Sequence, residues 1–175
     1  MTPTAWYGRA AHSDSAIDQL RRQHYGCARL LPDGQPYAGC YFDIGVGYRD
    51  ADQRDRRLDP ATVAAIGLPY SGGMAQLLHN ANDPTRRFQR VVCFELDRVS
   101  RNAHVLAYII DQLIAADVDL LVPSMTGLAT QAGHSPAQRF AATVALLTLQ
   151  ADHAQRHTRR LGHARTSAQD QEGRR

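Results

Sequence analysis

One carboxylate and two guanidinium groups lie close together in the segment Leu96-Asp97-Arg98-Val99-Ser100-Arg101-Asn102. The segment follows an apolar, β-rich run that begins at Arg90, so we expect Asp97 at the carboxyl end of a strand, where ligands of open α/β sheets bind. Arg98 and Arg101 are three residues apart and can face one ligand if the turn between them is helical. Two guanidinium groups beside a helix N-terminus favour a phosphate site, and an ordinary Asp–Arg pair in a solvated loop is the alternative.

The elements that must position these groups alternate along the chain. Strands are expected at residues 4–9, 37–43, 90–96 and 118–122, and helices at residues 16–27, 74–78 and 105–114 and from Pro136 onward. This alternation predicts an α/β fold: a three-layer, mainly parallel sheet of four to five strands with helices on both faces, and a long C-terminal helix. The carboxyl ends of the strands should bring Arg9, Asp43 and the Asp97 segment to one edge.

The 175 residues are expected to form one domain with three parts. Residues 1–135 should form the α/β core, with an inserted mixed-charge loop at about residues 48–70, where no apolar period is visible. Residues 136–163 should form the long helix, whose apolar stripe fits a subunit contact or packing on its own sheet, and residues 164–175 a basic, disordered tail. The sequence has no apolar run of membrane-spanning length and no charged leader, so we expect a cytoplasmic protein.

All 20 basic residues are arginine, and the formal net charge is +3. A GC-rich coding sequence explains much of this bias, but arginine also binds phosphate at two points. The cysteines Cys27, Cys40 and Cys93 have no CxxC spacing and lie in apolar surroundings, which favours buried reduced thiols. His153 and His157 are four residues apart, but they have no acidic or cysteine ligand nearby and favour a solvated helix face. We therefore expect neither a metal nor a cofactor.

Several short motifs, in order along nearly the whole chain, resemble those of the serine recombinases, the resolvase/invertase family. The most specific is the segment at residues 96–102, which resembles Leu-Asp-Arg-Leu-Ser-Arg-Asn. The resemblance implies the fold of that family's catalytic domain. The other matches are Tyr7-Gly8-Arg9 for Tyr-x-Arg, Ser15 with Gln19 for Ser-x-x-x-Gln, Tyr41-Phe42-Asp43-Ile44-Gly45 for Tyr-x-Asp-x-Gly, and His134-Ser135-Pro136-Ala137-Gln138-Arg139 for the Thr-Pro-x-Gly-Arg start of the long helix.

The resemblance also implies a reaction, DNA strand exchange. In that reaction a serine attacks the scissile phosphodiester, and arginines stabilise the charge on the phosphoryl oxygens. By resemblance, Arg9, Arg98 and Arg101 face the phosphate and Asp97 orients them. DNA is the implied partner, together with a homodimer or a hetero-oligomer with a related recombinase through residues 136–163. Three further residues are implied to support DNA phosphate binding: Gln19, Asp43 and Arg139.

The sequence departs from the family at the nucleophile. Arg9 is followed by Ala10 and Ala11 where the family has Arg-x-Ser, and a methyl group cannot attack phosphorus. Gly47 and Ser71 replace a serine and an arginine of the family, and too few residues follow the long helix for the family's DNA-binding module. These departures predict a catalytically degenerate relative that acts by binding DNA or a recombinase partner. A decayed remnant of a mobile element would have the same sequence features.

Two other functions stay open. An active recombinase could use a substitute nucleophile, with Ser13 as the nearest candidate and Ser15 behind it, although helix capping explains both serines. His12, beside them, could move a proton. Alternatively, an α/β domain could bind a small phosphorylated ligand at the same arginines. That function has less support, because Gly45-Val46-Gly47 lacks the spacing of a phosphate-binding glycine loop.

Overall fold

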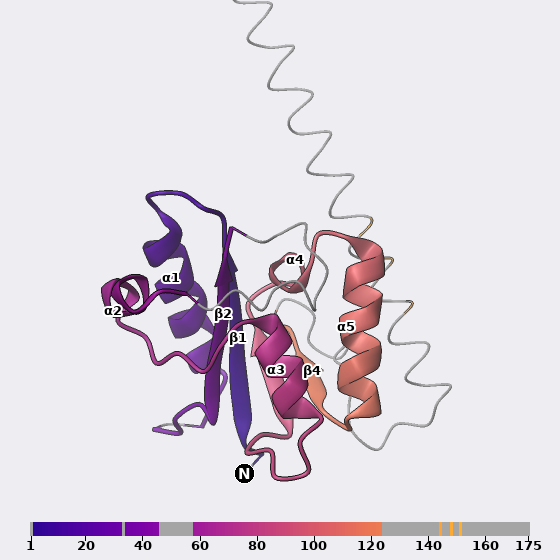
Figure 1. The fold of residues 1–175 in the computed structure, drawn as a ribbon. Coiled ribbons are helices and arrows are strands. Elements are labelled where there is room, and N and C mark those ends of the chain that lie inside the picture. The colour runs from indigo at the N-terminus through magenta and orange to yellow at the C-terminus, as the bar shows by residue number, and fades with distance from the viewer. Residues whose placement is uncertain are drawn as a thin grey trace, which may run out of the picture.

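The computed structural model describes residues 2–32, 34–45 and 58–123, together with Val144, Thr148 and Ala151. Strands and helices alternate along it, as the sequence predicts (Figure 1). None of the helices in this part of the chain is long and apolar enough to cross a membrane. In chain order the elements are β1 (Thr4–Ala10), α1 (Ala16–Ala28), β2 (Gly39–Ile44), α2 (Pro60–Ile66), α3 (Met74–Ala81), β3 (Arg90–Cys93), α4 (Leu96–Val99), α5 (Ala103–Ala115) and β4 (Asp119–Leu121).

The strands form a parallel four-stranded sheet in the order β2-β1-β3-β4, which confirms the predicted α/β fold. β1 pairs with β2 along almost its whole length, from Ala5 to Ala10. Its pairing with β3 is shorter and ends where Tyr7 meets Cys93. The last residues of β1 therefore extend past the end of β3, and α4 lies beside them (Figure 1).

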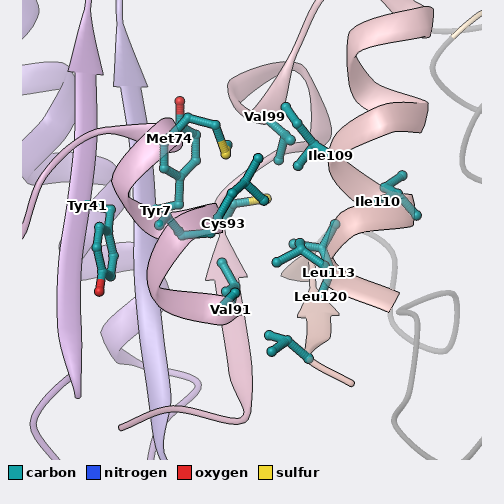
Figure 2. Close-up of a cluster of buried hydrophobic side chains, with 14 of the residues drawn as sticks. Tyr7, Tyr41, Met74, Val91, Cys93, Val99, Ile109, Ile110, Leu113 and Leu120 are labelled. Atoms are coloured by element: carbon teal, nitrogen blue, oxygen red, sulfur yellow. The ribbon is translucent and has the colours of Figure 1, made fainter. Parts of the chain in front are cut away.

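Helices cover both faces of the sheet, α1 and α2 on one side and α3 and α5 on the other (Figure 1). Successive side chains of a strand point to opposite faces. Tyr7 accordingly packs in the core under α3 and α5, whereas Trp6 and Ala10 pack in the core under α1 and α2. The predicted three-layer arrangement is confirmed. Figure 2 shows the first core around Tyr7, with side chains from the sheet, α3 and α5: Met74, Val91, Cys93, Ile109 and Leu113.

The three cysteines are free and buried, as predicted from their apolar surroundings. Burial raises the pKa of the Cys27 thiol to about 12 and that of Cys40 to about 11. The pKa of Cys93 is raised as well, by burial first and then by neighbouring acidic groups. Because the thiolate is the reactive form, these thiols stay protonated and unreactive near neutral pH, and they serve as small apolar side chains.

Part of the predicted loop at residues 48–70 is a helix, so the loop prediction was wrong over α2. Asp59 caps its N-terminus by accepting hydrogen bonds from the backbone N–H of Thr62 at 2.9 Å and from its hydroxyl at 2.6 Å. Pro60 follows in the first turn, and Gly67 ends the helix with a φ of 67°. These are ordinary helix-boundary signals that the surrounding charges obscured. Arg21 of α1 donates to the last carbonyls of α2 and so joins the two helices.

Several predictions fall on residues that the structure does not describe. They concern the insertion between residues 46 and 57, the helix at residues 136–163 with Arg139, and the tail at residues 164–175. Within the long-helix segment, Val144, Thr148 and Ala151 are helical, and the Thr148 hydroxyl donates to the Val144 carbonyl at 2.9 Å. Val144 is 44% exposed. The subunit contact expected of this helix stays a prediction.

Candidate anion-binding site

The helical turn α4 carries Asp97 and Arg98 of the predicted phosphate site, and Arg101 follows two residues after its end. β3 ends at Cys93 and α4 begins at Leu96, so the strand predicted at residues 90–96 was too long, and Asp97 lies in the helical turn just past the strand's carboxyl end. Packing explains the difference. Leu96 and Val99, three residues apart, are both buried in the core under α3 and α5, and a helical turn is what puts residues at that spacing on one side. The same turn leaves Asp97 and Arg98 partly exposed.

The Asp97 carboxylate lies between two guanidinium groups. Its Oδ1 is 3.2 Å from Arg98 Nε, and its Oδ2 is 4.0 Å from Arg101 Nε. The contact at Oδ1 is an ion pair without an aligned hydrogen bond. Glu95 makes a further ion pair with Arg98, with 3.5 Å between Oε2 and Nη2. Both guanidinium groups thus lie beside the Asp97 carboxylate, although α4 ends at Val99 and the extended Ser100 separates Arg101 from the helical turn.

The guanidinium groups of this turn remain accessible to a ligand. The side chain of Arg98 is 22% exposed and that of Arg101 is 50% exposed. The neighbouring N-terminus of α5 contributes less than expected, because the side chain of Asn102 already accepts from the backbone N–H groups of His104 at 2.9 Å and Val105 at 3.5 Å. Accessible positive charge at this end of the sheet therefore comes mainly from side chains.

Arg9 lies underneath the turn rather than on its surface. It is only 5% exposed. Its Nε donates to the backbone carbonyl of Arg98 at 2.9 Å, and its Nη2 donates to the carbonyl of Asp97. Hydrogen bonds from a charged donor are about twice as strong as neutral ones. Arg9 therefore ties the end of β1 to α4, and its predicted contact with phosphate stays a prediction.

Gln23, which the sequence analysis did not single out, fixes the backbone of Arg9. Its side-chain oxygen accepts from the Arg9 N–H at 3.1 Å, and its amide nitrogen donates to the Arg9 carbonyl at 3.0 Å. The two bonds lie beyond the point at which pairing of β1 with β3 ends. Gln23 is 5% exposed and shares the buried face of α1 with Leu20 and Cys27. Its position within an apolar helical stripe is the sequence feature by which Gln23 could have been identified.

Asp43 lies in register with Arg9, at the end of the neighbouring strand β2. Its carboxylate is buried, and Oδ2 accepts from the Tyr7 hydroxyl at 2.8 Å and from the backbone N–H of Met74 at 3.2 Å. The second bond reaches the first residue of α3. Asp43 therefore joins β1, β2 and α3 beside the anion-binding residues.

The serines that follow β1 form a short exposed chain of hydroxyl groups. Ser13 Oγ is 3.1 Å from Ser15 Oγ, which accepts from Gln19 Nε2 at 2.8 Å. The prediction that these hydroxyls cap α1 was wrong, since Ser15 occupies the N-cap position without a side-chain capping bond. Among the described residues, neither hydroxyl is hydrogen-bonded to an arginine. Ala11 and His12, which precede them, are exposed.

No family model and no curated protein matches this chain. Among solved structures, the chain is similar to the N-terminal catalytic domain of TP901-1 integrase, with 18% sequence identity and a TM-score of 0.49. The match covers 87% of this chain and 96% of that one. A similarity of this degree assigns no function, so the chemistry of the site rests on its own residues. Over the residues that the structure describes, no group of three or more histidine, cysteine or acidic side chains could hold a metal ion.

Proposed function

We propose that this protein is a serine-recombinase-like DNA-binding protein that has lost the nucleophile of strand exchange. The observation that supports it best is the Asp97 carboxylate, which lies between the guanidinium groups of Arg98 and Arg101 at the end of a parallel sheet. Guanidinium groups held in this way are organised before a phosphoryl group arrives. The family and the DNA ligand come from the sequence motifs, which the site geometry supports.

Each residue has a separate part in this proposal. Arg98 and Arg101 contact the phosphoryl oxygens, and Asp97 orients them. Ala11 occupies the position of the family's nucleophile, so the phosphodiester is bound without being cleaved. The protein acts in the cytoplasm as a homodimer, or with a related recombinase, through residues 136–163. Arg9 faces the same phosphate from beneath, Arg139 is a further phosphate contact, and Gln19 and Asp43 have supporting roles.

Arg98→Ala is expected to weaken binding of a mixed-sequence DNA duplex because it removes one phosphate contact. The slope of the logarithm of the binding constant against the logarithm of the salt concentration should fall by about one. Fluorescence anisotropy titrations at several salt concentrations measure both quantities. Arg87→Ala is the matched control, because Arg87 is an exposed arginine that precedes β3 and so lies toward the opposite end of the sheet. Equal losses in the two variants would contradict a DNA site on α4.

A second candidate function, strand cleavage by a substitute nucleophile, is favoured by the exposed hydroxyl groups of Ser13 and Ser15, the second of which accepts from the Gln19 amide. We expect no covalent complex when the protein is incubated with duplex DNA and separated on a denaturing gel, because neither hydroxyl is held by the arginines. A DNA adduct that survives denaturation and disappears in Ser13→Ala would support the second candidate. Ser15→Ala identifies which hydroxyl reacts.

A further inference from the structure

The charges around Arg98 balance one another, which is unusual for an anion-binding site. Arg98 and Arg101 each carry one positive charge, and Asp97 and Glu95 each carry one negative charge, so the four side chains have no net charge. A phosphoryl group that approaches Arg98 therefore meets a guanidinium group that already has two acidic partners.

The two carboxylates are held in different ways. Asp97 bridges both arginines and its side chain is 21% exposed. Among the described residues, the Glu95 carboxylate is paired with Arg98 alone, at 3.5 Å, and its side chain is 42% exposed. Although Glu95 occupies the N-cap position of α4, its carboxylate makes no capping hydrogen bond. Displacing Glu95 from Arg98 should therefore require less free energy than displacing Asp97, so an incoming anion would displace Glu95 first.

We propose that Glu95 is an intramolecular competitor for the phosphoryl group, paired with Nη2 of Arg98 until a ligand displaces it. The inference rests on the proposed function and deepens it by naming the residue that limits anion affinity at that site. An exposed ion pair of this kind contributes little to stability. Its removal should leave the fold intact while it frees Nη2 of Arg98 and gives the four-residue cluster a net charge of +1.

Glu95→Gln is expected to raise the affinity for duplex DNA about two- to five-fold, the range of a single exposed ion pair. Anisotropy titrations measure this, and pyrophosphate, followed by its effect on the thermal unfolding midpoint, serves as a second probe without DNA. Asp18→Asn is the matched control, because it removes one negative charge from an exposed position of α1, on the other face of the sheet. In an Arg98→Ala background, Glu95→Gln should have no effect.

The outcomes separate this inference from the proposed function. If the wild type binds DNA through Arg98 but Glu95→Gln binds no more tightly than Asp18→Asn, the competitor role is wrong and the proposed function stands. If the wild type binds no DNA while Glu95→Gln gains pyrophosphate binding, the proposed function fails and Glu95 still competes for anions. No gain with either probe overturns the inference.

Discussion

Arg9→Ala is expected to lower the free energy of unfolding by about 3–5 kcal/mol, because hydrogen bonds from charged donors contribute roughly 1.5–3 kcal/mol each. The substitution removes two such donors, which bind the carbonyls of Asp97 and Arg98. Arg9 is buried, so water replaces it poorly at these carbonyls. The bond between the end of β1 and α4 is lost along with the charge.

Urea unfolding measures this effect through the transition midpoint. Arg22→Ala is the control, because Arg22 is an exposed arginine on α1, and its loss should change stability by less than about 0.5 kcal/mol. Arg9→Lys keeps the charge but cannot donate in two directions from a planar fork, so its stability should lie between those of the wild type and Arg9→Ala. If Arg9→Ala were as stable as Arg22→Ala, the coupling between β1 and α4 would be refuted.

The sheet could be predicted from the sequence because local patterns encode it. The apolar run at Val91–Cys93 and the helical stripe from Val105 to Ile114 each identify one element without knowledge of the rest. Element boundaries were less predictable. The end of β3 depends on how Leu96 and Val99 pack against α3 and α5, and that contact joins residues distant in sequence.

In the candidate site, too, local spacing could be read from the sequence, whereas contacts between distant residues could not. The three-residue spacing of Arg98 and Arg101 predicted that they could share one side of a helical turn. The helical turn ends at Val99 and Ser100 is extended, but both guanidinium groups still lie within 4.0 Å of the Asp97 carboxylate. The burial of Arg9 could not be predicted in this way, because it follows from the different lengths of β1 and β3. Gln23 was missed for the same reason, since its partner is the backbone of β1 where that strand extends past β3.

Gly8→Ala is expected to destabilise the fold by about 1–3 kcal/mol, the usual cost of overpacking a core. A Cβ atom at this position would lie 2.3 Å from Cζ2 and 2.5 Å from Cη2 of Trp6, far closer than carbon atoms approach. The indole cannot move aside, because it is completely buried and packs against His24 and Phe42 at ring-centroid distances of 5.0 and 6.0 Å. β1 must therefore have glycine beside the tryptophan.

Trp6→Phe tests this explanation, because phenylalanine lacks the two ring atoms that meet the added Cβ. By itself, Trp6→Phe should also destabilise the fold, since it leaves a cavity under α1. The double variant should lose less stability than the sum of the losses in the two single variants. We expect a difference of about 1 kcal/mol or more in a double-mutant cycle measured by urea unfolding. Additive losses would show that the steric contact with Trp6 is not the reason for glycine. The result bears on the site as well, because Gly8 precedes Arg9, and strain that displaces β1 would be passed to α4.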